Sequence, residues 1–170
     1  MRRIAFVLIS AVTTVVMGAS AALAASPHFT HGPDYKATTT ELTATGQAAG
    51  LAALATTAQL TADSVVTNFH CVNHGNNFAP GHPAVESPAA GTPQAITPRN
   101  GNIKFSPTLP AFVPNAADVC PNKNWKVIVD EVDYLGVVLT ISQGTTVILS
   151  DGPANFTSCA AGIGNCVFTG

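Results

Sequence analysis

Alternating apolar and polar residues mark the clearest strand of the chain. From Ser64 to Val72 every second side chain forms one row, made of Val65, Thr67, Phe69 and Cys71. Successive side chains of a β-strand point to opposite faces, so this period of two predicts a half-buried strand with Cys71 in the core. The segment Asn73–Asn77 then breaks the pattern, since Gly and Asn tolerate the positive φ of tight turns.

The longest block of apolar runs extends from Trp125 to Ser150 and is interrupted at Leu135-Gly136 and Gln143-Gly144. Three apolar runs separated by turn residues predict an antiparallel meander. The charged pair Asp130-Glu131 interrupts the alternation and is expected to form a bulge. The side chains expected to point inward are Trp125, Val127, Val129, Val132, Tyr134, Val137, Leu139 and Ile141.

Two earlier segments give weaker patterns. Thr38–Thr45 is rich in threonine and is predicted to be the first strand. Residues 48–59 fit both a helical stripe and a strand alternation. The frequent threonines and the glycines at its start favour a strand over Ala53–Thr61.

Eight prolines lie between Pro80 and Pro114. Because proline cannot donate a hydrogen bond to a ladder, this stretch is expected to hold edge strands and long connections. Within it, Asn100-Gly101 predicts a hairpin turn between Gln94–Thr97 and Asn102–Ser106. Together these elements predict an all-β fold, an antiparallel β-sandwich that is Ig-like or related, with a small β-barrel as the second choice.

The N-terminal residues have the order of a secretory signal peptide: Arg2-Arg3, an apolar run from Ile4 to Met17, and Ala22-Leu23-Ala24. We therefore expect residues 1–24 to be removed and the mature chain to be secreted and extracellular. An uncleaved anchor and twin-arginine export are the alternatives. The apolar run is short for a membrane span, and the flanking Ser or Thr of the twin-arginine motif is missing.

The mature chain is expected to be one domain. Residues 25–37 contain prolines and histidines without a period and are predicted to be a flexible lead-in, and 38–170 to be a single β domain. Without Arg2 and Arg3, five basic residues face nine acidic ones, a formal net charge of −4. This balance argues against a nucleic-acid partner. No later segment is apolar for long enough to span a membrane.

The four cysteines are expected to form disulfides, because an exported chain meets an oxidising environment. Four cysteines allow three pairings. A flexible loop separates Cys159 from Cys166 and could close locally, which leaves Cys71 to pair with Cys120. By the chain-entropy model the longer loop contributes about 4 kcal/mol and the shorter one about 2–3 kcal/mol. No C-x-x-C spacing indicates a redox-active pair.

The histidines give a weak metal pattern. His70-Cys71-x-x-His74 has plausible spacing, and His28, His31 and His82 are further candidates. Neighbouring residues of a strand point to opposite faces, and an oxidised Cys71 is no longer a thiolate ligand. The sequence therefore favours surface histidines and predicts neither a metal site nor a cofactor.

Catalytic patterns are also weak. No serine lies in a G-x-S-x-G elbow, and Asp130, Glu131 and Asp133 fit a solvated strand face better than a pair of glycosidase carboxylates. Stacking on sugars requires exposed aromatic rings, and of Tyr35, Trp125 and Tyr134 the last two are assigned to the core. No catalytic residue is predicted.

Several short motifs resemble a group of uncharacterised small secreted actinobacterial proteins. The most specific is a C-x-N-x-G-x-N/x-x-P pattern in the run from Cys71 to Pro80; the others are Ala49-Gly50-Leu51, Asn100-Gly101 and Cys120-Pro121 followed by Val127 to Leu139. The resemblance covers Gly46 to Ile148 and implies an extracellular β domain with a Cys71–Cys120 bridge. The chain departs from the group at Ala52 and in its Cys159–Cys166 loop.

The sequence leaves more than one function open. The first is a secreted, non-catalytic binding or structural module of the cell surface or matrix, whose partner is an unidentified extracellular or envelope component. The second is a secreted hydrolase or enzyme inhibitor with a site built from the loop Asn73–His82, which requires a deep pocket with His74 or His82 beside a carboxylate or serine. An Ig-like pilus domain with an isopeptide bond would need a buried Lys104 or Lys126.

Overall fold

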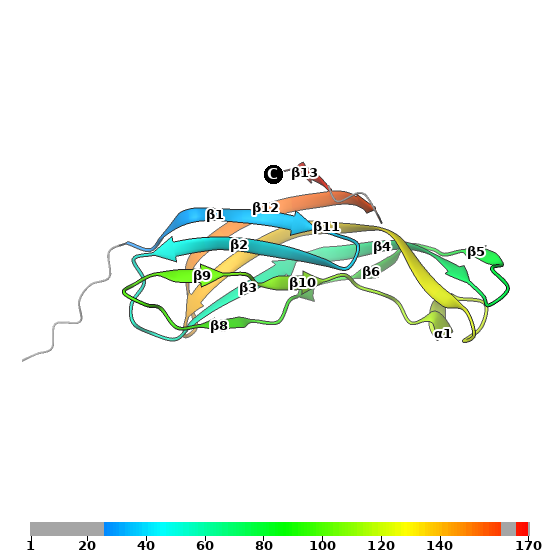
Figure 1. The fold of residues 1–170 in the computed structure, drawn as a ribbon, viewed down its shortest axis with the longest axis horizontal. Helices are drawn as coiled ribbons and strands as arrows, with labels where there is room; N and C mark the ends of the chain where they lie inside the picture. Colours follow the sequence, from blue (N-terminus) through cyan, green and yellow to red (C-terminus); the bar gives the residue numbers. More distant parts are fainter. Residues whose placement is uncertain (1–25, 161–165, 170) are drawn as a thin grey trace, which may run out of the picture.

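The computed structural model describes residues 26–160 and 166–169 and contains two antiparallel sheets (Figure 1). The predicted signal peptide and most of the loop between Cys159 and Cys166 lie outside the described residues. The smaller sheet consists of β1 (His28–Ala37), β2 (Glu41–Ala49), β9 (Ile103–Phe105) and β10 (Thr108–Pro110). The larger sheet consists of β3 (Thr56–Ala62), β4 (Ser64–Val72), β5 (Phe78–Pro80), β6 (Ala84–Glu86), β7 (Ala89–Ala90), β8 (Gln94–Ile96), β11 (Lys126–Gln143), β12 (Thr146–Ala160) and β13 (Val167–Thr169).

The long strand β11 is the spine of the larger sheet. One edge pairs with β12, while the other pairs first with β4 and then with β3. A register shift between Val129 and Glu131 confirms the predicted bulge. The prediction of a turn at Leu135-Gly136 is wrong, because β11 continues through these residues. The turn at Gln143-Gly144 is present, and Gln143 pairs with Thr146 across it.

A local bend replaces the expected turn. Gly136 has φ +63°, and a side chain there would collide with the Asp63 carboxylate. Asp63 separates β3 from β4, and its backbone N–H donates to the carbonyl of Leu135 at 2.9 Å. A positive φ is accessible to glycine at low cost, so Gly136 bends β11 opposite the break between β3 and β4 without ending the strand.

The core lies between the smaller sheet and one half of the larger sheet. The alternation predicted for β4 is confirmed, since its inward row is buried. In β11 the predicted inward row is buried from Val132 to Ile141, whereas Val127 and Val129 near the start of the strand are only partly buried. Gly91 marks the place where the two sheets approach: its N–H donates to Leu60 of β3 at 2.9 Å, and a side chain there would strike the Thr108 carbonyl of β10. Among the largest fully buried side chains are Tyr134, Leu42, Leu60, Leu109, Leu139 and Ile141.

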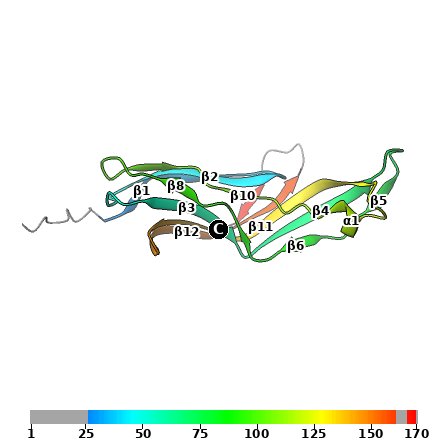
Figure 2. The ribbon, with the colours of Figure 1, turned by 90° about the horizontal axis from the view of Figure 1, so that it is seen from below.

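The architecture is therefore an antiparallel β-sandwich with an extension. Figure 2 shows the strands of the smaller sheet covering the end of the larger sheet that holds β3, while β4, β5 and the far end of β11 project beyond that cover. The helix α1 (Ala116–Val119) lies at this projecting end. The Asn115 side chain caps it by accepting a hydrogen bond from the Ala117 N–H at 3.0 Å.

The prediction of a flexible lead-in at 25–37 is wrong for its larger part. Residues His28–Ala37 form β1, which pairs with β2 along its length with two register shifts. Phe29 packs edge-on against Phe105, with ring centroids 5.9 Å apart, and Tyr35 packs against Phe156 at 5.2 Å. Long-range aromatic contacts therefore hold a segment whose own sequence lacks a strand period.

Two early strands begin later in the sequence than predicted. Thr38 forms a turn by accepting hydrogen bonds at its Oγ1 from the N–H groups of Thr40 and Glu41, so β2 begins at Glu41 and not at Thr38. Residues 48–59, which fitted either a helix or a strand, contain the end of β2, a connection over 50–55 and the start of β3. The strand alternative was therefore correct for β3, with a small shift toward its C-terminal end.

The Asn100-Gly101 turn occurs where it was predicted, but it does not join two strands of one hairpin. Asn100 and Gly101 both have positive φ, and Arg99 bridges Asn102. The flanking strands then diverge, since β8 pairs with β3 in the larger sheet and β9 pairs with β2 in the smaller sheet. The turn therefore carries the chain from one sheet to the other.

The two disulfides pair the cysteines as predicted from the sequence. Cys71, on the inward row of β4, is bonded to Cys120, which follows α1, with the two Cα atoms 5.8 Å apart. Cys159, at the end of β12, is bonded to Cys166. The described part of the chain has no free cysteine.

A tyrosine–carboxylate contact connects the two sheets. The Tyr35 hydroxyl of β1 donates to Asp151 Oδ2 of β12 at 2.6 Å. Burial, and secondarily the hydrogen bond and charge of Asp151, raises the pKa of Tyr35 above its ordinary value of 10. The proton is therefore retained in the folded protein at a pH where the unfolded chain releases it.

Tyr35→Phe is expected to lower the free energy of unfolding at neutral pH by about 1–2 kcal/mol, because a hydrogen bond to a carboxylate is lost. Above pH 10 the wild type should lose stability as pH rises, since its unfolded state binds fewer protons than its folded state. Above pH 10 the free energy of unfolding of the variant should fall by about 1.4 kcal/mol less per pH unit than that of the wild type, because the variant lacks this one titrating group. Urea unfolding at neutral and alkaline pH measures both effects, and an unchanged alkaline slope would contradict the assignment.

Candidate functional site

The projecting end of the larger sheet has two different faces. We call it the distal sheet and define it as β5, the Phe69–Val72 end of β4 and the Lys126–Val129 end of β11. Cys71 and Phe69 are 1% and 5% exposed on one face. The disulfide to Cys120 ties the segment that carries α1 to this inner face. The opposite, outer face lacks such a cover from the described elements.

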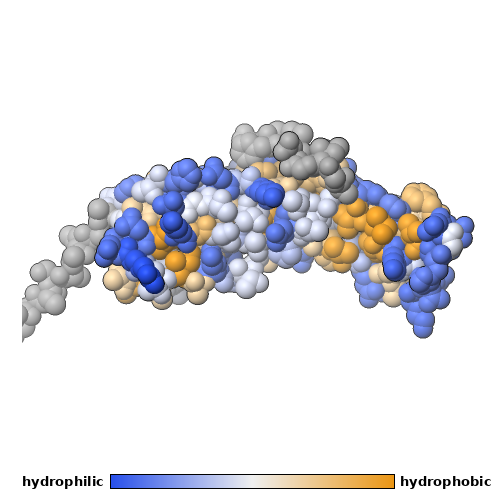
Figure 3. Space-filling model, viewed as in Figure 1, coloured by the Kyte–Doolittle hydropathy of each residue, from blue (hydrophilic) through white to orange (hydrophobic). Residues whose placement is uncertain are grey.

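Strand pairing places the outer-face side chains in two rows. Phe78, Val72 and Lys126 are opposite one another across the three strands. Pro80, His70 and Ile128 form the next row. Phe78 is 64% exposed and Ile128 is 42% exposed. Figure 3 shows an extended apolar area at this end of the molecule.

His70 is held in place on this face by two neighbours. Its Nδ1 lies 2.8 Å from Asp130 Oδ1 and 2.9 Å from Asp130 Oδ2. Its ring lies 4.9 Å from the ring of Phe78, measured between centroids. The carboxylate fixes the imidazole, and the imidazole in turn supports the exposed phenyl ring. A preoriented aromatic side chain loses less entropy when a partner covers it.

A hollow of about 260 Å³ continues the outer face toward the Asn73–Asn77 turn. Asn73 shapes this turn, because its Oδ1 accepts hydrogen bonds from the N–H groups of Gly75 and Asn77, both at 2.9 Å. The hollow contains amide, imidazole and ammonium groups above an apolar base. Its lining residues are Val72, Asn73, His74, Asn76, Asn124, Lys126 and Ile128.

The loop predicted as a possible active site thus contributes to this hollow, but without the expected chemistry. His74 is there, yet no carboxylate or serine lines the hollow with it. The other histidine, His82, lies in a separate hollow of about 330 Å³ together with Asp118 of α1. Phe69, Pro83, Ala84 and Val119 complete that second lining, which contains an imidazole and a carboxylate but no nucleophilic side chain.

The other candidate residues do not converge. His70 and Cys71 lie on opposite faces of β4, and Cys71 is oxidised. Within residues 26–160 and 166–169, no three His, Cys, Asp or Glu side chains gather as metal ligands would. His31 lies 3.5 Å from Asp34 on β1, and the His28 ring contacts the Ser26 carbonyl, far along the chain from His70.

Each of the three neighbouring carboxylates has its own partner. Asp130 binds His70, Glu131 accepts a hydrogen bond from Asn68 at 3.5 Å, and Asp133 accepts one from the Ser158 N–H at 2.8 Å. These carboxylates therefore fix strand register and local turns. Lys104 and Lys126 are both exposed, which contradicts the buried lysine required by the isopeptide hypothesis.

The aromatic residues differ from the prediction at two positions. Tyr134 is fully buried, as expected, but Trp125 is only partly buried and is not part of the core. Phe78 was not singled out from the sequence. It follows the Asn-rich turn by one residue, and a two-strand register across that turn would have placed it opposite Val72 on the outer face.

In the part of the chain that the structure describes, no helix has the length and apolar character to span a bilayer. Comparisons of the chain with protein-family models, curated proteins and solved structures find no match. The function must therefore be argued from the geometry of the distal sheet and its surroundings.

Proposed function

We propose that this chain is a secreted, non-catalytic binding module of the cell surface or extracellular matrix, and that it binds through the outer face of the distal sheet. One observation carries the proposal: Phe78 of β5 and Ile128 of β11 are exposed on the same sheet face, with His70 and Val72 of β4 between their strands. A polar hollow that Ile128 lines adjoins them, and the described elements leave this face uncovered. Exposed apolar side chains gathered on one face are typical of interaction sites.

The extracellular location rests on two features. The N-terminal residues have the order of a secretory signal. The two disulfides are compatible with an oxidising compartment, where such bonds persist. The resemblance to small secreted actinobacterial proteins points to the same location and makes the actinobacterial cell wall the first material to test.

The outer face combines anchoring and orienting groups. Phe78, supported by His70, is a rigid aromatic anchor of the kind that carries much of the binding energy at interfaces. Lys126 and His74 at the hollow supply donors that orient a partner. The Cys71–Cys120 bond fixes the strand beneath these groups, so little order has to be gained on binding.

Truncation of the anchor should weaken retention on insoluble cell-wall material. Phe78→Ser and Ile128→Ser are each expected to cost about 1–2 kcal/mol of binding, roughly 5–30-fold in the half-saturating concentration. Val147→Ser is the matched control, because Val147 is also an exposed strand residue, at 55%, but lies on β12. Equal retention of all three variants would argue against the distal sheet as the binding surface, and no retention of the wild type would argue against the proposed function.

A hydrolase remains the second candidate, and the hollow with His82 and Asp118 favours it. A histidine beside a carboxylate could activate water as a general base. Turnover of an ester or glycoside substrate that His82→Gln and Asp118→Asn abolish, while Phe78→Ser leaves it intact, would support this alternative over the binding module.

A further inference from the structure

The place where β8 and β9 separate into different sheets contains a third hollow, at the end of the molecule opposite the distal sheet (Figure 1). The Asn100-Gly101 turn closes one end, and the Ser106 N–H donates to Gln94 Oε1 at 2.8 Å near the other. We call this space, of about 340 Å³, the seam hollow. It is lined by Gln47, Ile96, Thr97, Arg99, Asn102, Ile103 and Lys104.

The seam hollow has an apolar base and a cationic rim. Ile103 is 4% exposed and Ile96 is partly buried, so their side chains form the base. Arg99 and Lys104 are exposed, and within the described residues neither has a carboxylate within 4.0 Å. Figure 3 shows apolar surface bordered by strongly hydrophilic side chains at this end of the molecule. Two cations beside a small apolar surface favour an anion that carries a hydrocarbon chain.

We propose that the seam hollow binds the carboxylate of a small amphiphile, a medium-chain fatty acid. The carboxylate would lie between Arg99 and Lys104, and the acyl chain would cover Ile96 and Ile103. The volume lies in the range of small-molecule pockets and suits one chain of this kind. A peptide strand fits less well, because the Ser106 N–H that it would pair with is already occupied by Gln94.

Titration of the full mature protein with octanoate, octan-1-ol and acetate measures the separate contributions of the carboxylate and of the hydrocarbon chain to binding. Octanoate should bind at least ten-fold more tightly than either octanol, which lacks the charge, or acetate, which lacks the chain. Amide shift changes in an NMR spectrum should include residues 96–104. Equal binding of octanol and octanoate, or shifts confined to other regions, would overturn the proposal.

Charge variants test the rim. Arg99→Gln and Lys104→Gln should each weaken octanoate binding at least five-fold, and the effect should diminish at high salt as the charges are screened. Lys36→Gln and Lys123→Gln are matched controls, because both lysines are exposed but do not line the seam hollow. Unchanged binding in the two rim variants would exclude this site. The cell-wall test of the distal sheet is independent, since Phe78 and Ile128 are not part of this lining.

Discussion

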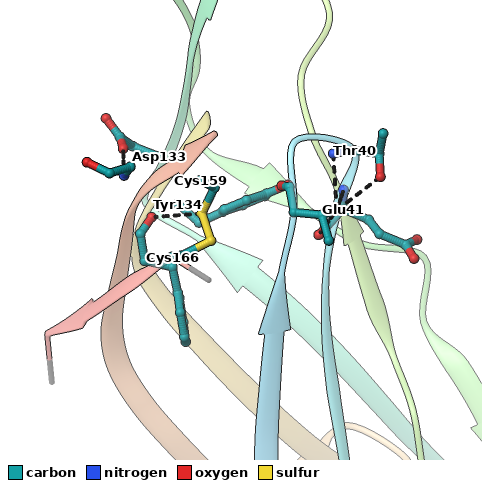
Figure 4. Close-up of a disulfide and its surroundings, with 9 residues drawn as sticks. Thr40, Glu41, Asp133, Tyr134, Cys159 and Cys166 are labelled. Atoms are coloured by element: carbon teal, nitrogen blue, oxygen red, sulfur yellow. Dashed lines mark hydrogen bonds between the residues drawn. A yellow bond between two sulfur atoms is a disulfide. The ribbon is translucent and has the colours of Figure 1, made fainter. Parts of the chain in front are cut away.

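Tyr134→Ala is expected to lower the free energy of unfolding by about 3–5 kcal/mol, the range found for large aromatic side chains removed from well-packed cores. Tyr134 is fully buried on β11, and its hydroxyl donates to the Thr38 carbonyl at 3.0 Å. Figure 4 shows it extending from beside the Cys159–Cys166 disulfide toward Thr40 and Glu41, where the connection between β1 and β2 ends and β2 begins. One side chain therefore connects the larger sheet to the turn between β1 and β2.

Tyr134→Phe separates packing from hydrogen bonding. It retains the ring but leaves the Thr38 carbonyl without this donor, so a loss of about 1–2 kcal/mol is expected. Burial, and secondarily the charge of Glu41, raises the pKa of Tyr134, so the variant should also reduce the loss of stability above pH 10. Urea unfolding of both variants measures these effects. A loss below about 1 kcal/mol in Tyr134→Ala would contradict a core role for this residue.

The position of Tyr134 could be predicted because the strands around it carry a local period. Val132, Tyr134 and Val137 lie on one inward row of β11, and the shift of one residue between Tyr134 and Val137 coincides with Gly136. The sequence nevertheless suggested a turn at Gly136. The bend depends on Asp63, which lies far away in the sequence between β3 and β4, and no local pattern encodes this contact.

Non-local contacts also explain the error at the N-terminus. Residues 28–37 lack a strand period, yet Phe29 and Tyr35 find aromatic partners in Phe105 and Phe156, far along the chain. The Asn100-Gly101 turn was local and was predicted correctly. Which sheet β8 and β9 each join depends on packing throughout the core. The Asn100-Gly101 motif alone therefore could not show that the two strands belong to different sheets.

The candidate site could not be predicted from the sequence because it too depends on contacts between segments far apart in the chain. The loop Asn73–His82 was named from its composition, but the importance of Phe78 depends on the register of β5 against β4. The approach of Asp118 to the hollow of His82 depends on the segment that the Cys71–Cys120 bond ties to β4. The spacing of cysteines can suggest a disulfide, but it cannot predict which surface residues the disulfide brings close together.

Removal of the Cys71–Cys120 bond is expected to have the second large effect. The bond closes a separation of 49 residues, and its loss in a Cys71→Ala/Cys120→Ala variant should cost about 4 kcal/mol by the chain-entropy model. The Cys159–Cys166 bond spans only 7 residues, so the corresponding double variant should lose about 2–3 kcal/mol. Thermal and urea unfolding of the two variants provide a matched comparison.

The two bonds should also differ in their effect on binding. Cys71 lies beneath the outer face of the distal sheet, between His70 and Val72, whereas Cys159 lies on β12. Loss of the Cys71–Cys120 bond should therefore release the segment carrying α1 and weaken retention on cell-wall material at a temperature where the variant is still folded. Loss of the Cys159–Cys166 bond should leave retention near the wild-type level. Equal losses of retention in the two variants would mean that global stability, and not the order of the distal sheet, limits binding.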